Sequence, residues 1–170
     1  MREFGYFPRM ILAICGELEA DREQLAAVAA ASGADETLEY APVADSEVWD
    51  ERFAANLTAA EAFLEGSRPA LVLTAGAGSI ALATSLAATR GGFRLARLVR
   101  SAGAGNREAA RDATLADHLA ELLICFSEAD REGLSADSLR RAAICCETPD
   151  QAGAAISALL RAPGPSAPAL

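Results

Sequence analysis

Residues 70–89 constrain the fold of this chain more than any other stretch. The run ALVLT at residues 70–74 is short and apolar, which is typical of a strand buried on both faces of a parallel sheet. A turn with two glycines follows at residues 75–78. Ser79 is then placed to cap a helix that begins at Ile80 and is rich in alanine and leucine. The stretch therefore predicts one strand, turn and helix unit of an α/β fold.

The turn at residues 75–78 has two interpretations. In an open parallel sheet it would lie at the carboxyl end of a strand, where ligands bind, and the free N–H groups of the following helix would attract an anion. However, its two glycines lack the third glycine of a G-x-G-x-x-G pattern, and no Lys-Ser/Thr pair completes a P-loop. We expect small residues here chiefly to bring helix and strand together. The candidate ligand contacts from this turn are Gly76, Ala77, Gly78 and Ser79.

Strand and helix patterns alternate along the remaining chain. Further strands are expected at residues 10–15, 37–40, 93–99, 122–126 and 142–146, and helices at 21–31, about 45–65, from 107, and 149–161. Such alternation predicts a Rossmann-like, three-layer α/β sandwich with a mostly parallel sheet and helices on both faces. We expect one domain over residues 1–161 and a flexible, proline-rich tail over residues 162–170.

Two further turns follow predicted strands. Residues 101–106 have the sequence SAGAGN, and Ser127-Glu128 opens a capping box before the next turn of helix. Because the carboxyl ends of parallel strands share one edge of the sheet, these turns are expected to line one crevice with the first turn. Their candidate ligand contacts are Ser101, Gly103, Asn106, Ser127 and Glu128.

Three arginines, Arg94, Arg97 and Arg100, interrupt the apolar strand before the second turn. Side chains alternate across a strand, so the three cannot all face one side. One interpretation is that they emerge at strand ends or pair with acidic groups at the surface. The other is that Arg97 or Arg100 reaches a bound anion.

The charge of the chain argues against nucleic acid as a partner. With 24 acidic and 15 basic residues, its formal net charge is −9, which would repel a phosphate backbone. No apolar run approaches the length that spans a bilayer, and the first fifteen residues lack the features of a secretory signal. We expect a soluble, cytoplasmic protein that binds neither nucleic acid nor membrane.

The four cysteines of the chain are expected to be reduced and structural. Each lies in or beside a predicted strand, no C-x-x-C spacing occurs, and the single histidine, His118, lies on a predicted helix. We expect no metal site and no cofactor. The adjacent pair Cys145-Cys146 could be redox-active, although Arg140 and Arg141 are the only basic residues nearby in sequence that would favour thiolates.

Four stretches resemble the N-terminal domain of the non-hydrolysing UDP-N-acetylglucosamine 2-epimerases. They are PALVLTAGAGSIALATSLAA at residues 69–88, SAG at 101–103, LADHLAELLICFSEADREGL at 115–134 and ICCETPDQA at 144–152. In the family these look like a P-D-L-V-L-V-H-G-D-T strand and turn, an H-V-E-A-G-L-R turn, a helix ending D-H-L-A-D-L, and a T-E cap before a helix. The resemblance implies one half of a two-domain GT-B fold, truncated at both ends, with residues 10–16 matching the family's second strand.

The same resemblance implies that catalysis has been lost. The family eliminates and re-adds UDP at carbon 2 of the sugar, which requires carboxylates to move protons. Ala77 stands where the family has its H-G-D acid, and Ser101, or Val99 with a shifted gap, stands where it has the glutamate of H-V-E-A-G. The P-E-E element falls on residues 108–113, where Glu108 matches a catalytic acid only after a slip of one or two residues.

Three hypotheses about function follow from the resemblance. The first is a pseudoenzyme that acts through protein contacts, as a homodimer or as the partner of a larger sugar-nucleotide enzyme, since the family's N-terminal domain supplies its dimer contact. The second is an enzyme or binder with a new small-molecule function at the strand-end crevice, with UDP-sugars as possible ligands. The third is one subunit of a split GT-B enzyme.

Overall fold

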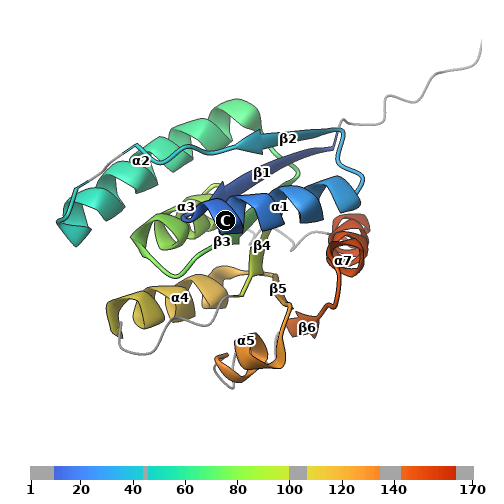
Figure 1. Ribbon diagram of the computed structural model, residues 1–170. Coiled ribbons are helices and arrows are strands. Elements are labelled where there is room, and N and C mark those ends of the chain that lie inside the picture. Colours follow the sequence, from blue (N-terminus) through green and yellow to red (C-terminus); the bar gives the residue numbers. More distant parts are fainter. Residues whose placement is uncertain (1–9, 44–45, 100–106, 135–142, 164–170) are drawn as a thin grey trace, which may run out of the picture.

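A parallel β-sheet forms the middle layer of the protein (Figure 1). The computed structural model describes residues 10–43, 46–99, 107–134 and 143–163. The strands in these ranges are β1 Ile11–Gly16, β2 Glu36–Glu39, β3 Leu71–Ala75, β4 Leu95–Leu98, β5 Leu122–Cys125 and β6 Ala143–Cys145. They lie in the order β2-β1-β3-β4-β5-β6, and every neighbouring pair is parallel. The predicted Rossmann-like α/β fold is confirmed.

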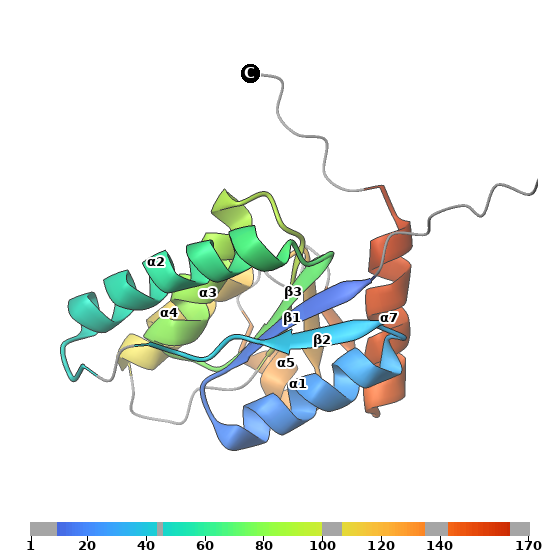
Figure 2. The ribbon, with the colours of Figure 1, turned by 90° about the horizontal axis from the view of Figure 1, so that it is seen from above.

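Helices cover both faces of the sheet, as the three-layer prediction requires. The described helices are α1 Glu19–Ala31, α2 Trp49–Ser67, α3 Ser79–Arg90, α4 Arg107–Leu119, α5 Glu128–Glu132 and α7 Pro149–Arg161. Helices α1 and α7 pack together on one face, and α2, α3 and α4 lie on the other (Figures 1 and 2). The short α5 contacts β5 and β6.

The sheet divides the apolar core into two layers because successive side chains of a strand point to opposite faces. In β1, Leu12 and Ile14 join the layer beneath α1 and α7, whereas Ala13 and Cys15 join the layer beneath α2 and α3. All five residues of β3 are buried, which confirms that this apolar run forms a strand covered on both faces.

The chain reverses its direction of travel across the sheet at β1. Strand β2 follows on one side of β1, while β3 and all later strands follow on the other. In doubly wound sheets this reversal marks the switch point. In the strand order 3-2-1-4-5-6, the reversal occurs at the first strand. Strand β1 therefore has the place of a first strand within this sheet, and its match to the family's second strand stays a prediction. The loop after β1, which begins at Glu17, lies at the switch point.

One predicted helix cap is confirmed, another is wrong, and Thr148 caps a third helix. The side chains of Ser127 and Thr148 accept backbone N–H bonds at the starts of α5 and α7. Helix α3, in contrast, has Gly78 as its N-cap and no side-chain cap from its own first turn. The hydroxyl of Ser79 instead accepts a hydrogen bond from Nε of Arg52 at 2.7 Å. The Ser79 hydroxyl, which the local sequence predicted to cap α3, therefore bonds to Arg52 of α2 instead.

The helices of the described ranges include none with the length and apolarity needed to cross a membrane.

Candidate functional site

The carboxylate of Glu17 lies on the N-terminus of α3, at the switch point between β1 and β3. Its two oxygens accept backbone N–H bonds from Gly78 at 2.8 Å, Ile80 at 3.1 Å and Ala81 at 3.2 Å. The first turn of a helix leaves N–H groups without helical partners and carries a partial positive charge. Glu17 therefore supplies, from within the chain, the anion that such a helix end attracts.

The two glycines of the β3–α3 turn make room for this carboxylate. A Cβ atom at Gly76 would lie 2.9 Å from Oε2 of Glu17, and one at Gly78 would lie 2.6 Å from Oε1. Gly76 also has a φ of 114°, in a region that side chains disfavour. The small residues thus serve a close packing role, as expected, but toward the loop after β1 as well as toward the sheet. The sequence analysis missed Glu17, since nothing local links it to a turn 60 residues later.

Arg52 of α2 lies beside the same turn. Besides its bond to Ser79, the Arg52 guanidinium donates to the carbonyl oxygen of Ser46 at 2.8 Å. The candidate residues Gly76, Ala77, Gly78 and Ser79 are therefore brought together at the end of β3, with Glu17 and Arg52 as neighbours that the sequence did not reveal. Contact of these four residues with a ligand stays a prediction.

A row of polar side chains lies beneath α3, inside the core. Cys15, Thr74 and Arg97 occupy paired positions on β1, β3 and β4. Helix α3 supplies their partners: the Thr84 hydroxyl contacts Sγ of Cys15 at 3.3 Å, and the Ser85 hydroxyl lies 3.3 Å from that of Thr74. Burial raises the pKa of Cys15 to about 11, although the hydrogen bond from Thr84 acts in the other direction. The row is held by small polar side chains that allow α3 to lie close to the sheet.

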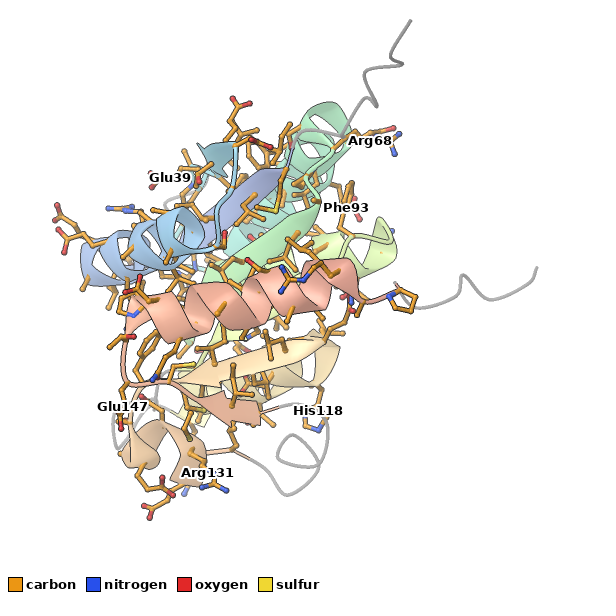
Figure 3. The ribbon with its side chains drawn as sticks, turned by 90° about the vertical axis from the view of Figure 1, so that its right-hand side faces the viewer. Glu39, Arg68, Phe93, His118, Arg131 and Glu147 are labelled. Carbon is orange, nitrogen blue, oxygen red and sulfur yellow. The ribbon has the colours of Figure 1, made fainter. Side chains whose placement is uncertain are left out.

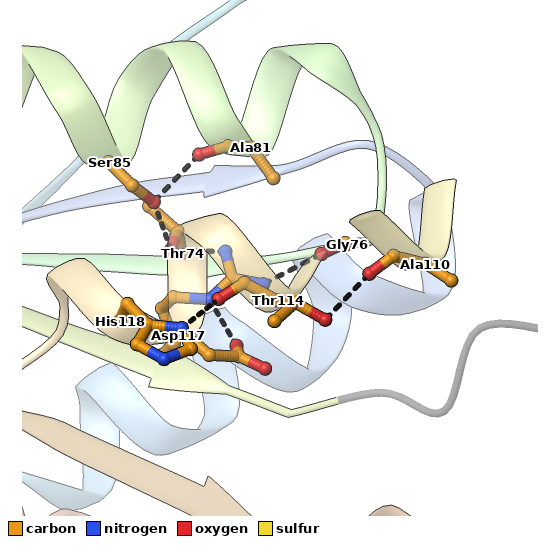
Figure 4. A network of polar contacts seen from close by, with 9 residues as sticks. Thr74, Gly76, Ala81, Ser85, Ala110, Thr114, Asp117 and His118 are labelled. Carbon is orange, nitrogen blue, oxygen red and sulfur yellow. Dashed lines mark hydrogen bonds and ion pairs between the residues drawn. The ribbon is translucent and has the colours of Figure 1, made fainter. Parts of the chain in front are cut away.

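Arg97 joins this row to the turn. The side chain is 1% exposed, and its guanidinium donates to Asp117 at 2.9 Å, to the Thr74 hydroxyl at 3.1 Å and to the carbonyl oxygen of Gly76 at 2.9 Å (Figure 4). Burial raises the pKa of Asp117, while its ion pair with Arg97 lowers it. Arg97 therefore pairs with an acid, as one interpretation held, but does so inside the core.

The other two arginines have different outcomes. Arg94 forms an ion pair with Glu121 at 2.9 Å and donates to the carbonyl oxygens of Leu159 and Ala162 at the end of α7. It thereby ties β4 to the last helix, in keeping with the interpretation that pairs these arginines with acids at strand ends. Arg100 lies outside the described residues, so its contact with an anion stays a prediction.

His118 has a local partner on its own helix. Its Nδ1 lies 2.7 Å from the carbonyl oxygen of Thr114, one turn earlier in α4 (Figure 4). The predicted helical position of His118 is confirmed, and its ring is hydrogen-bonded within α4.

The third candidate turn uses its polar groups within α5. The Ser127 hydroxyl accepts the backbone N–H of Asp130 at 3.1 Å and donates to the Asp130 carboxylate at 2.7 Å. The exposed Glu128 carboxylate lies 3.4 Å from Arg131, and Figure 3 shows Arg131 and Glu147 projecting outward at this corner. This turn follows β5, two strands away from β3. Ser101, Gly103 and Asn106 lie outside the described residues, and their place in a crevice stays a prediction.

A groove of about 530 Å³ lies among α2, α3 and α4. Between two of its lining residues, Nε1 of Trp49 donates to the Asp112 carboxylate at 2.7 Å. The Arg111 guanidinium lies 5.5 Å from the centre of the Trp49 ring, within the range of a cation–π contact. Leu82 and the half-exposed Leu115 complete an apolar lining. Trp49 is thus a half-buried residue of this groove.

Comparisons with known proteins bear on the fold. No protein-family model matches the chain, and no curated protein sequence matches it either. Solved structures do match. The S. aureus MnaA–UDP co-structure superposes with a TM-score of 0.64 at 16% identity, over 81% of this chain and 43% of that one.

Two further solved structures give the same result. The UDP-GlcNAc 2-epimerase of Methanocaldococcus jannaschii, in complex with UDP-GlcNAc and UDP, matches with a TM-score of 0.61 at 17% identity, over 77% of this chain and 43% of that one. The UDP-N-acetylglucosamine 2-epimerase of Rickettsia bellii matches with a TM-score of 0.61 at 14% identity, over 91% of this chain and 50% of that one. The chain thus spans about half the length of each of these solved structures and shares the fold of that half, as the sequence resemblance implied.

Proposed function

We propose that this chain is a non-catalytic domain with a UDP-GlcNAc 2-epimerase-like fold, and that it acts through protein contacts. The observation that carries the proposal is the carboxylate of Glu17 on the N-terminus of α3. A phosphate group at this helix end would have to displace Glu17 and would meet its negative charge. The strand-end position that is most suited to an anion is therefore taken by the protein itself.

The residues around the turn support a loss of epimerase chemistry. Removal and return of UDP at the sugar need groups that accept and donate protons. At the position that the resemblance assigns to an acid, the chain has Ala77. The nearby carboxylate of Glu17 accepts hydrogen bonds from three backbone N–H groups. It therefore serves as a helix cap rather than as a proton carrier.

The groove among α2, α3 and α4 is the surface that we assign to contact with a second copy of this chain. Leu115, in its lining, is 49% exposed, and Val48, which precedes the lining residue Trp49 in sequence, is 54% exposed. Charges of both signs line it, with Asp50 and Arg111 among them. A two-fold interface needs a patch that is complementary to itself, and neighbouring apolar, acidic and basic groups meet that need.

The test is the mass of the protein in solution. Light scattering during gel filtration, over a range of concentrations, should give twice the mass of the chain, and Leu115→Asp should give the monomer. Leu18→Asp is the matched control, because Leu18 is 66% exposed on the opposite layer, before α1, and it should leave the dimer intact. A wild-type protein that is monomeric at every concentration would argue against the proposal. A Leu115→Asp variant that stays dimeric would show that the interface lies elsewhere on the protein.

Binding of a sugar nucleotide is the second candidate function, alone or as one subunit of a split enzyme. It is favoured by the solved structures that share the fold and contain UDP or UDP-GlcNAc. Thermal unfolding with UDP, UDP-N-acetylglucosamine and UDP-N-acetylmannosamine distinguishes the two candidates. A ligand at 100 times its dissociation constant stabilises a protein by about 2.7 kcal/mol. We expect no such increase, and a clear one with any of the three would favour the second candidate.

A further inference from the structure

The sheet register brings two cysteines side by side at its exposed edge. Cys125 is the last residue of β5, Cys145 is the last residue of β6, and the two are paired across the strands. Paired residues of parallel strands point to the same face, and neighbouring strands lie about 4.8 Å apart. Disulfides join residues whose Cα atoms are about 4.4 to 6.8 Å apart. The backbone therefore already holds these two cysteines at a distance that a disulfide can bridge.

The adjacent cysteine, Cys146, points the other way. It is buried in the layer beneath α1 and α7, whereas Cys125 belongs to the layer on the opposite face of the sheet. Successive side chains of extended backbone alternate between faces, so Cys145 and Cys146 diverge although they are neighbours in sequence. The tertiary structure thus replaces the pair that the sequence indicated with a pair 20 residues apart.

The two paired thiols differ in their access to solvent. Cys145 is exposed and Cys125 is buried. Burial raises the pKa of Cys125 to about 12, and the nearby Cys145 acts in the same direction. Cys145 is therefore the thiol that an external reagent meets first, and Cys125 is placed to react with it afterwards.

We propose that Cys145 and Cys125 form a redox pair that closes to a disulfide when the protein meets a low-molecular-weight disulfide. The thiolate of Cys145 attacks one sulfur of the reagent, forms a mixed disulfide and releases one reagent thiol. Cys125 then loses its proton to solvent and attacks Sγ of Cys145, which releases the second reagent thiol. Two protein thiols are oxidised and one external disulfide is reduced.

Closure of this pair would link β6 covalently to β5. Strand β6 has three residues and pairs with β5 alone among the described strands. It leads directly into α7, whose N-cap is Thr148. The disulfide would therefore fix the shortest of the described strands and the start of the last helix.

Oxidised glutathione and intact-mass spectrometry test the proposal on the folded, full-length chain. The product should be a monomer about 2 Da lighter than the reduced protein, because two hydrogen atoms are lost. Cys146→Ser should react in the same way, and fragmentation of its digest should link Cys125 to Cys145. Cys145→Ser should gain no disulfide, and Cys125→Ala should stop at a mixed disulfide on Cys145.

Several results would overturn the proposal. They are a wild-type chain that stays fully reduced, a mixed disulfide that persists in the wild type, a disulfide-linked dimer, or a disulfide that still forms in Cys145→Ser. If Cys125→Ala does not fold, as judged by circular dichroism, the linkage found in Cys146→Ser decides the question by itself.

Discussion

The carboxylate of Glu17 accepts the backbone N–H of Gly78 at 2.8 Å, across 61 residues of sequence. With the bonds from Ile80 and Ala81, this contact makes a residue from the β1–α1 loop the cap of α3. It also joins the two strands between which the chain reverses direction. The switch point of the sheet is thus closed by a side chain of the protein, which is the basis of the proposed loss of catalysis.

Replacing Glu17 by alanine should destabilise the protein. The change removes three hydrogen bonds to a charged acceptor and leaves helix N–H groups without partners, at a cost of about 1 to 3 kcal/mol in the free energy of unfolding. Urea unfolding followed by circular dichroism measures this. Glu23→Ala is the control, because Glu23 is exposed on α1 and should change stability by less than about 0.5 kcal/mol. Equal effects of the two changes would refute the capping role.

A methyl group at Gly78 should act by displacing Glu17. Gly78 has an ordinary φ of −113°, so Gly78→Ala strains no backbone, but its Cβ would lie 2.6 Å from Oε1 of Glu17. We expect a loss of about 1 to 3 kcal/mol. Once Glu17 is already alanine, the same substitution should have little effect. A double-mutant cycle measures this coupling.

Gly66→Ala is the matched control for this cycle. Gly66 lies within α2, and a Cβ there would meet nothing within 4 Å. Alanine is the better helix former by about 0.5 to 1 kcal/mol, so this variant should be as stable as the wild type or more so. Additive effects of Glu17→Ala and Gly78→Ala would show that the glycine does not serve to admit the carboxylate.

Breaking the buried ion pair of Arg97 and Asp117 from one side should cost far more than breaking a surface pair. Asp117→Ala leaves the buried Arg97 charge without its acid, which costs about 3 to 5 kcal/mol. Glu61→Ala, which breaks the exposed pair with Arg90, should cost about 0 to 1 kcal/mol. The combined change Arg97→Met and Asp117→Leu should recover much of the loss. Urea unfolding of the four proteins tests this ranking, and a small effect of Asp117→Ala would contradict it.

Cys15 should make the protein less stable in alkali. Burial raises its pKa from 9.0 to about 11, so the folded chain keeps this proton at a pH where the unfolded chain has lost it. Between about pH 9 and pH 11 the folded state binds more protons, and its stability therefore falls as the pH rises. Above that window the loss reaches about 2 to 3 kcal/mol.

The variant Cys15→Ala should lose stability less steeply over this window, whatever its stability at neutral pH. Urea unfolding at intervals of half a pH unit gives the two slopes. Thr58→Ala is the control, because Thr58 is exposed and carries no titratable group, so it should leave the slope as in the wild type. Parallel curves for the wild type and Cys15→Ala would contradict the prediction.

Local patterns were sufficient to predict the elements of the fold. The apolar run before Gly76 forms β3, the alanine-rich segment after it forms α3, and Ser127 caps the helix that it was expected to cap. Each of these features depends on residues within a few positions of one another. Because strands and helices alternate, the parallel sheet with helices on both faces follows from the same patterns.

The partners of the polar side chains could not be predicted in this way. Ser79 was expected to cap α3, but Arg52 bonds its hydroxyl and Glu17 takes its place at the helix end. Arg97 was expected at the surface or on an anion, but its acid is Asp117 in the core. Each of these contacts joins residues that are 20 to 63 positions apart.

The sequence by itself determined where the described strands and helices and the small-residue turn at residues 75–78 lie, because hydrophobic period, glycine and capping residues act over one or two turns of chain. Only the tertiary structure decided that Glu17 fills the end of α3 and that Cys125, rather than Cys146, lies beside Cys145. The physical reason is that strand order and register determine which distant side chains meet. A carboxylate or a thiol takes its function from the groups that the register places beside it.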